Sequence, residues 1–327
     1  MNQATASFTT MKASADTLAN GAIVVNMYEQ EIADIVRRES VALQRFSKPP
    51  ADGHPHRYFE QTAIASAGFT DPRNIAPTPA GPTRVERAAM VKAISAETDF
   101  GLFDVQVTQQ QGKFAYVESK DIEDITSACV VTAAGAVWTG TDTSLTTPTT
   151  IQYVGLLTQI TQQATIAPGA SIIDGLKAQV AAMFANQTYK VRPTGIMLSP
   201  LLGDLIDKEA KAASIKLTEM VVAGVTVTAL NTQAGTLPLI PEPYIPTDTG
   251  AKYGFSIVAG NKNYYAVILT EPWVEMPYIN PNGGSDPQLF ELGLLAGLQK
   301  KFVAVWFNCI IAKGPSYAHS VVAVQRP

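Results

Sequence analysis

The sequence predicts an α+β fold with more than one lobe. Two stretches carry apolar residues at steps of three and four, which is typical of amphipathic helices: Lys113 to Trp138, and the stretch that begins at Ser171. Short apolar or alternating segments, typical of strands, dominate towards the C-terminus. A chain of 327 residues exceeds what one simple core usually holds, so we expect two lobes that share one chain.

The N-terminal region is predicted to form an arm and a short helix. Residues 1–20 are rich in Ala, Ser and Thr and lack apolar periodicity, so alone they would be flexible and would become ordered only against a partner. Helical spacing runs from Ile23 to Phe46. Lys48-Pro49-Pro50 ends this helix, because proline cannot continue one.

A two-stranded finger is predicted after the helix. Two extended segments, Arg57 to Ile64 and Arg84 to Ile94, flank a stretch dense in glycine and proline, Gly68 to Pro82. Because proline removes a backbone donor and fixes φ, this stretch favours a stiff projecting loop over a piece of core. It is also too apolar to be simply solvated, which makes four of its residues candidates for contact with another subunit: Phe69, Asp71, Arg73 and Ile75.

A strand and a long helix are predicted next. Phe103, Val105 and Val107 alternate with polar residues, which predicts a half-buried strand. The helix from Lys113 to Trp138 would be about 39 Å long at 1.5 Å per residue and would cross the subunit like a strut. Its surface carries an acidic group that lacks the glycine and final glutamate of a calcium loop and is predicted to face solvent or an interface: Asp121, Glu123 and Asp124.

The second half of the chain is predicted to mix short helices with strands. Ser171 and Asp174 form an S-x-x-D capping pair before one helix, and Ser199-Pro200 begins another. The apolar residues expected to face inward on these helices are Ile172, Ile173, Leu176, Val180, Met183 and Phe184, then Leu201, Leu202, Leu205 and Ile206. The expected strands are 195–198, 225–230, 237–240, 253–259, 264–270, 289–298 and 302–312, with a hairpin turn at 260–263.

Residues that could support catalysis or hold a cofactor are sparse. The chain has three histidines and none of the dinucleotide-binding, phosphate-loop, zinc-protease or nucleophile-elbow motifs. His54 and His56 lack further ligands nearby and are predicted to be exposed loop residues. Cys129 and Cys309 lie in apolar surroundings and are predicted to be buried and inert. We therefore expect no catalytic, cofactor-binding or metal site.

Charge and composition point to an oligomer. Charged residues make up 16% of the chain, against about 25% in an ordinary soluble domain, so neighbouring copies are expected to cover part of the surface. The net charge of -4, without a basic block, argues against a general nucleic-acid binder. Residues 1–20 lack the features of a secretory signal, and the longest apolar run, Phe302 to Ala312, is about half the ~20 residues that span a bilayer. We expect a soluble, non-secreted protein.

The order of these elements, together with four local segments, carries a resemblance to a known family. The order is flexible arm, short helix, Pro/Gly-tipped finger, long strut helix, mixed lobe and closing strands. The local segments are 136–140 with 153–157, 195–200, 224–227 with 237–241, and 299–305. In these respects the chain resembles the major capsid proteins of tailed bacteriophages with the Hong Kong 97-type fold, which encapsulin shells share.

The resemblance implies a division of the chain. It would comprise an N-terminal arm and short helix (1–50), an E-loop (51–100), a P-domain with its spine helix (101–160), an A-domain (161–275) and return strands of the P-domain (276–327). The A-domains would meet around the axes of hexamers and pentamers, and the E-loops and arms would lie over neighbouring copies. The short region before the first helix implies that any scaffolding protein is a separate chain.

The resemblance also implies a function. The chain would assemble with itself into an icosahedral head that encloses double-stranded DNA without sequence-specific binding, without a cofactor and without a membrane, in a virion assembled in the host cytoplasm. Portal and cement proteins would be further partners. Two alternatives remain open: an encapsulin-like compartment that holds a cargo enzyme, and an α/β enzyme with a dispersed active site.

Overall fold

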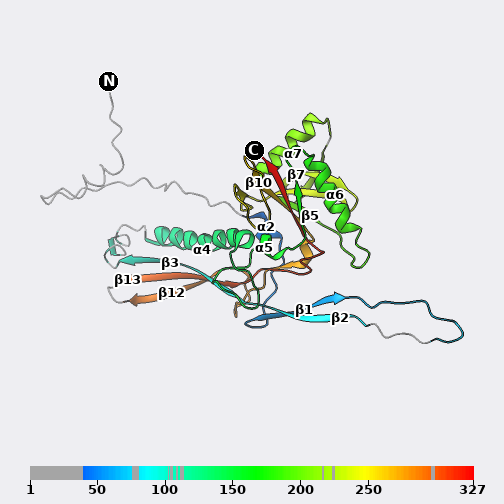
Figure 1. The fold of residues 1–327 in the computed structure, drawn as a ribbon. Coiled ribbons are helices and arrows are strands. Elements are labelled where there is room, and N and C mark those ends of the chain that lie inside the picture. Colours follow the sequence, from blue (N-terminus) through cyan, green and yellow to red (C-terminus); the bar gives the residue numbers. More distant parts are fainter. Residues whose placement is uncertain are drawn as a thin grey trace, which may run out of the picture. The chain divides into compact units, whose positions relative to one another are not determined.

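The structure is a computed structural model in which helices and strands alternate irregularly along the chain (Figure 1). It describes residues 40–75, 81–101, 103, 106–107, 110, 114–215, 217–222, 225–295 and 299–327. The predicted arm lies outside these residues, as does most of the predicted helix from Ile23 to Phe46. The predicted continuity of that helix to Phe46 is wrong in the described residues: Ser40 is an extended N-cap whose side chain accepts from the Leu43 amide, so a separate short helix, α2 (Val41–Arg45), begins there.

The predicted finger is confirmed as a two-stranded antiparallel sheet. It consists of β1 (His56–Ala63) and β2 (Thr83–Ala89), paired from His56 with Ala89 to Ala63 with Thr83 (Figure 1). The second extended segment was predicted as one strand from Arg84 to Ile94, and this is wrong. It divides near Met90 into β2 and β3 (Lys92–Gly101), and β3 pairs with a strand from the far end of the chain.

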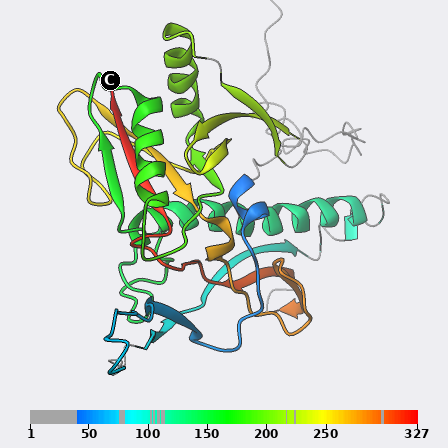
Figure 2. The ribbon, with the colours of Figure 1, turned by 90° about the vertical axis from the view of Figure 1, so that its right-hand side faces the viewer.

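The long helix packs against a three-stranded antiparallel sheet. The helix is α4 (Phe114–Thr139), and the sheet order is β12 (Gln288–Leu295), β13 (Gln299–Asn308), β3. Figure 2 shows α4 running alongside β3. The contact buries a cluster of apolar side chains comprising Ile125, Cys129, Phe302 and Ala304. The predicted helix from Lys113 to Trp138 is therefore confirmed.

The strand predicted around Phe103 is wrong for the residues that the structure describes. Phe103, Gln106, Val107 and Gln110 are helical. Phe103 and Val107 lie four residues apart, so their spacing suits one face of a helix as well as one face of a strand, and an alternation this short does not separate the two.

A larger mixed sheet forms the second lobe of the described chain. Its order is β4, β15, β10, β5, β8, β7, β6, and β9 pairs with β10. The bounds are β4 (Gln163–Ile166), β5 (Gly195–Leu198), β6 (Thr218–Val222), β7 (Val225–Thr232), β8 (Gly235–Pro241), β9 (Thr247–Asp248), β10 (Lys262–Leu269) and β15 (Ser320–Arg326). The pairs β4–β15 and β5–β8 are parallel.

Both faces of this sheet are buried, as the alternation along β10 shows. Tyr264, Ala266 and Ile268 join a core with α6 (Ile172–Phe184) and α7 (Pro200–Ala212). Tyr265, Val267 and Leu269 join a second core that includes α2 and the end of α4. Because successive side chains of a strand point to opposite faces, β10 contributes to two cores at once.

The capping predictions for α6 and α7 are confirmed, but two inward-facing residues were assigned wrongly. Ser171 accepts a hydrogen bond from the Asp174 amide, and Ser199 accepts one from the Leu202 amide. Phe184 is 47% exposed and Leu201 is 61% exposed. Phe184 is the last residue of α6 and Leu201 the second residue of α7, so each lies at an end of its helix.

The strand predicted at 253–259 and its hairpin with the following strand are wrong. Tyr253 adopts φ 52° in a turn, and β10 pairs with β5, β9 and the C-terminal β15 instead. Strands β4, β6 and β15 were not predicted. The connecting elements are α5 (Leu156–Gln159), a 3-10 turn (Glu271–Trp273), β11 (Val274–Glu275) and β14 (Ile311–Ala312). No helix of the described chain is long and apolar enough to cross a membrane.

Candidate assembly surfaces

The described part of the finger tip exposes the apolar residues that the sequence singled out. Phe69 is fully exposed and Ile75 is 73% exposed. Asp71 accepts hydrogen bonds from the Arg73 amide (2.9 Å) and, through its carbonyl, from the Asn74 amide (3.0 Å), which closes a tight turn. The Asp71 carboxylate accepts from the backbone of its own turn, and the Arg73 side chain is exposed.

The predicted acidic group lies on the surface of α4. Glu123 and Asp124 are exposed and Asp121 is half-buried. Lys120 pairs with Glu123 at 3.2 Å. Partial burial, together with the neighbouring Asp124 carboxylate, raises the pKa of Asp121. The group therefore carries unfavourable like-charge repulsion that a cation from another molecule would relieve.

The finger is fastened to the rest of the subunit near its base. Glu60 accepts a hydrogen bond from the Gly314 amide (2.9 Å) with one carboxylate oxygen and from Arg87 Nε (3.1 Å) with the other. Tyr189 donates its hydroxyl hydrogen to the Thr62 carbonyl at 2.6 Å. These bonds come from segments far apart in sequence, so they fix the orientation of β1 against the lobe that carries Tyr189.

Aromatic rings extend this attachment. Tyr189 stacks on Tyr317 with ring centroids 3.9 Å apart, and Trp273 meets Tyr317 edge-on at 6.0 Å. Between these rings and β1 lies an open groove with an empty volume of about 1080 Å³, bordered also by Phe59 and Ile64. Phe59 borders the groove and yet stays 74% exposed.

Two carboxylates hold the segment around α2. Glu242 is fully buried and accepts hydrogen bonds from the Ala42 amide (2.8 Å) and from Ser40 Oγ (3.0 Å). Burial raises the pKa of Glu242, and these hydrogen bonds offset part of that rise. At the other end of α2, Arg45 donates to both oxygens of Glu271 at 2.7 Å. The described start of the chain is thereby fixed to the core.

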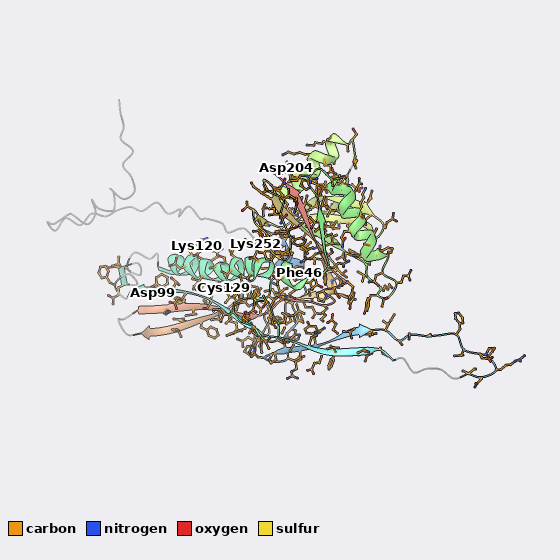
Figure 3. All side chains as sticks on the ribbon, viewed as in Figure 1. Phe46, Asp99, Lys120, Cys129, Asp204 and Lys252 are labelled. Carbon is orange, nitrogen blue, oxygen red and sulfur yellow. The ribbon has the colours of Figure 1, made fainter. Side chains whose placement is uncertain are left out.

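The same segment packs into the core through Phe46. Its ring lies 6.2 Å from that of Trp138 near the end of α4. Figure 3 labels Phe46 and, on α4, Cys129. Beyond Phe46 the backbone pairs in parallel with the last residue of β11 and the chain after it, through Ser47 with Glu275 and Pro50 with Tyr278.

A buried aspartate organises the loop between α4 and α5. Asp142 accepts hydrogen bonds from the Thr143, Thr149 and Thr150 amides at 2.7, 3.1 and 2.8 Å, and Lys92 Nζ lies 3.8 Å from it. Burial acts to raise the pKa of Asp142, but the hydrogen bonds to its carboxylate outweigh it and hold the pKa well below its usual value. The carboxylate therefore stays ionised as the hub of the loop.

The histidines and cysteines do not form a cluster in the described chain. His54 is exposed, but the prediction that His56 is exposed is wrong: it begins β1 and is 7% exposed. His319 is buried, accepts from the Thr270 amide and donates to the Lys313 carbonyl, and burial lowers its pKa to about 4. Cys129 and Cys309 are buried as predicted. Among described residues no group of three or more His, Cys, Asp or Glu is placed to hold a metal ion.

Comparison with known proteins gives a fold but no sequence relative. No protein family matches the sequence, and no curated protein matches it. Among solved structures, the SrpI encapsulin of Synechococcus elongatus PCC 7942 matches with a TM-score of 0.60 at 12% identity, over 95% of this chain and 94% of that chain. A structure from Gordonia phage Cozz gives 0.61 at 12% identity, over 100% and 98%. The capsid of an empty GTA particle gives 0.62 at 12% identity, over 95% and 97%.

The chain has the Hong Kong 97-type fold. The expected α+β architecture with a finger, a long spine helix and a mixed lobe is thus confirmed over nearly the whole length of the chain. In the terms of this fold, β1 and β2 form the E-loop and α4 is the spine helix. The matched structures include both capsids and an encapsulin.

Sequence reasoning found the tip of the E-loop but missed the residues that orient it. Glu60, Tyr189 and Tyr317 gave no local signal, because their partners lie more than 120 residues away or on another strand. Phe59 lies within the predicted extended segment from Arg57 to Ile64, and the sequence gives no further signal for its role. Asp142 could have been found, since a lone carboxylate before a run of threonine and serine residues has many nearby donors.

Proposed function

We propose that this chain is the shell-forming subunit of a tailed-bacteriophage head, which assembles with itself into a closed icosahedral shell around double-stranded DNA. The observation that carries the proposal is the full-length match of the fold to capsid structures, at coverage of 90% or more of each chain. The exposed apolar E-loop supports it, because such a surface needs a partner.

The proposal divides the chain as the resemblance implies. Residues 1–50 form the arm and short helix, 51–100 the E-loop, 101–160 the P-domain with its spine helix, 161–275 the A-domain and 276–327 the return strands. Since β3 pairs with β13, the segment 51–100 also supplies one strand to the P-domain sheet. Hexamers and pentamers of the chain would form the shell, without enzymatic activity, a cofactor or a membrane.

Further partners follow from the same proposal. Separate scaffolding, portal and cement proteins would act during assembly in the host cytoplasm, and the shell would belong to the virion. DNA would be enclosed without sequence-specific binding, consistent with a net charge of -4.

A second candidate function is an encapsulin-like compartment, favoured by the match to the SrpI encapsulin. Negative-stain microscopy of the expressed protein tests both shell functions, because either requires closed particles. Nuclease-protected DNA in particles from infected cells supports the phage head, whereas a stoichiometric cargo protein supports the compartment. Absence of particles at any concentration would contradict both.

The E-loop is proposed to clamp neighbouring subunits together. Deletion of residues 68–82 should leave a folded subunit, as judged by circular dichroism, that no longer forms stable shells. The single change Phe69→Ser should weaken shells in the same direction, and Phe69→Leu serves as the matched control because it keeps an apolar side chain. Arg73 is proposed to pair with the acidic group on α4 of a neighbour, worth about 0–1 kcal/mol if the pair stays exposed.

Normal shells of normal stability from the deletion variant would show that the E-loop is not a clamp. Hydrogen exchange provides an independent measurement. Residues 68–82 and the N-terminal arm (1–20) should gain protection on assembly, because neither segment has enough apolar residues to offset the entropy of ordering alone. Equal protection in free subunits and in particles would contradict the proposal.

A further inference from the structure

The groove between the root of the E-loop and the lobe that carries Tyr189 is more open than an attachment requires. Contacts that only hold a subunit together are close-packed. Here an open volume of about 1080 Å³ lies beside the bonds that Glu60 and Tyr189 make. Two apolar side chains that line it, Phe59 and Ile64, are 74% and 48% exposed. The groove is therefore an open cleft with accessible apolar surface, of the size that takes a small ligand.

Aromatic rings line this groove, and several of them hold one another in place. Tyr317 contacts two rings, that of Tyr189 at 3.9 Å in a stacked arrangement and that of Trp273 at 6.0 Å edge-on. The Tyr189 hydroxyl is fixed by its 2.6 Å bond to the Thr62 carbonyl. Because these rings are already ordered in the subunit, a ligand that packs on them avoids part of the entropic cost of binding.

Among the described residues, one charged side chain along the groove is left without an ion pair. Lys313 Nζ lies 2.6 Å from Glu275, and Arg87 Nε lies 3.1 Å from Glu60. Lys190 also lines the groove, is exposed and makes no ion pair with a described residue. A ligand with one isolated negative group complements this arrangement, whereas a polyanion such as nucleic acid would also meet the carboxylates of Glu60 and Glu275.

We propose that this groove binds a saccharide that carries an isolated carboxylate. The C–H bonds of a sugar ring are weakly positive and pack against the negative face of an aromatic ring, so Phe59 and Trp273 hold the sugar. Lys190 pairs with the carboxylate, and the Gln61 amide and the Thr188 hydroxyl bond the sugar hydroxyl groups. The site lies within one subunit, so this inference goes beyond the shell function and does not depend on it.

A proline-rich peptide is the rival occupant, because aromatic-lined grooves also bind such peptides. Proline has no backbone N–H, so a polyproline segment offers acceptors but neither donors nor a negative charge. It would leave Lys190 without a partner. A saccharide with a carboxylate offers hydroxyl groups that both donate and accept, together with the charge that Lys190 lacks. The polar lining of the groove therefore favours the saccharide.

Intrinsic tryptophan fluorescence reports on this groove. The chain has three tryptophans; Trp138 and Trp306 are 0% and 3% exposed, whereas Trp273 is half-buried at the groove. The probe is a tetrasaccharide of alternating glucuronate and N-acetylglucosamine, and the uncharged comparison is a tetrasaccharide of N-acetylglucosamine alone. The acidic probe should change the fluorescence of the full chain saturably. The uncharged one should bind about two- to fivefold more weakly, the factor expected for one exposed ion pair.

Two exposed side chains provide variants with matched controls. Lys190→Gln should abolish the preference for the acidic probe, and Lys190→Arg should keep it. Phe59→Ser should weaken the binding of both probes by about tenfold, because it removes a ring face, and Phe59→Tyr should bind like the unchanged protein. Lys211→Gln removes an exposed charge from α7 and should have no effect. Circular dichroism of each variant excludes misfolding as the cause of lost binding.

Three results would contradict the inference. No saturable change with either saccharide at millimolar concentration would overturn the site itself. Equal binding of the two saccharides would overturn the role of Lys190 and the acidic class of the ligand. Saturable binding of a polyproline peptide, without binding of the saccharides, would assign the groove to a peptide instead. The titration needs no particles, so a protein that forms shells and binds no saccharide keeps the shell function and loses only this inference.

Discussion

Replacing Arg45 tests how firmly the segment around α2 is tied to the core. The Arg45 guanidinium donates to both oxygens of Glu271 at 2.7 Å, and the two side chains are 21% and 14% exposed. Exposed ion pairs contribute about 0–1 kcal/mol, whereas breaking a fully buried pair costs about 3–5 kcal/mol. Since this pair lies between the limits and is bidentate, we expect Arg45→Met to lower the free energy of unfolding by about 2 kcal/mol.

The assay is urea unfolding of dissociated subunits, for Arg45→Met, Glu271→Gln and the double variant. Methionine keeps much of the apolar stem of arginine, so the loss reports mainly on the charged hydrogen bonds. The double-mutant cycle should give a coupling of about 1–2 kcal/mol. The matched control is Lys208→Met, which removes an ion pair with Asp204 whose partners are 68% and 61% exposed and should cost about 0.5 kcal/mol or less.

A loss for Arg45→Met no larger than that for Lys208→Met would refute the reasoning. It would mean that desolvation cancels the gain from the bidentate geometry. In that case the attachment of the segment would rest on the Glu242 hydrogen bonds and the packing of Phe46 instead.

Three further predictions follow from buried groups. Gly155→Ala should destabilise the subunit by several kcal/mol, since its Cβ would lie 2.5 Å from the Trp138 carbonyl oxygen. Gly135→Ala on α4 has open space for its Cβ and should raise the free energy of unfolding by roughly 0.5–1 kcal/mol. Equal effects of the two substitutions on urea unfolding would contradict this. The pKa of Asp142 is lower in the folded chain than in the unfolded one, so its stabilisation is present above the unfolded pKa of about 3.9 and is lost as pH falls through the folded pKa. Amide protection of residues 143–150 should therefore survive at pH 4 and disappear on further acidification. In Asp142→Asn this protection should already be lost at neutral pH. Cys309, whose pKa burial raises to about 12, should resist thiol reagents at pH 8 until the subunit unfolds.

Local patterns predicted the helices of the fold well. The spine helix was found within one residue at each end because its apolar spacing persists over many turns. Ser171 and Ser199 were identified as N-caps because the signal lies within three residues of the helix start. Such features depend on the chain nearby and not on how the lobes assemble.

Strand pairing was the part that local patterns could not supply. Lys262–Leu269 pairs with Ser320–Arg326, and β3 pairs with β13 some 200 residues away. The hairpin expected at Gly260 failed because a turn residue and a following strand do not show which strand is the partner. The E-loop attachment was missed for the same reason, since Glu60 and Tyr189 act on residues distant in sequence.

Gly140 and Gly155 are needed for a physical reason that the sequence alone does not reveal. The segments around Gly140 and Gly155 carried part of the resemblance only as a pattern of residue size. In the structure the Gly155 amide donates to the Gly140 carbonyl at 3.3 Å, and a Cβ on either residue would collide with backbone of the other segment. The end of the spine helix and the start of α5 therefore meet backbone to backbone, and only glycine permits that approach. A chain that closes its spine helix through this backbone contact therefore needs glycine at both positions.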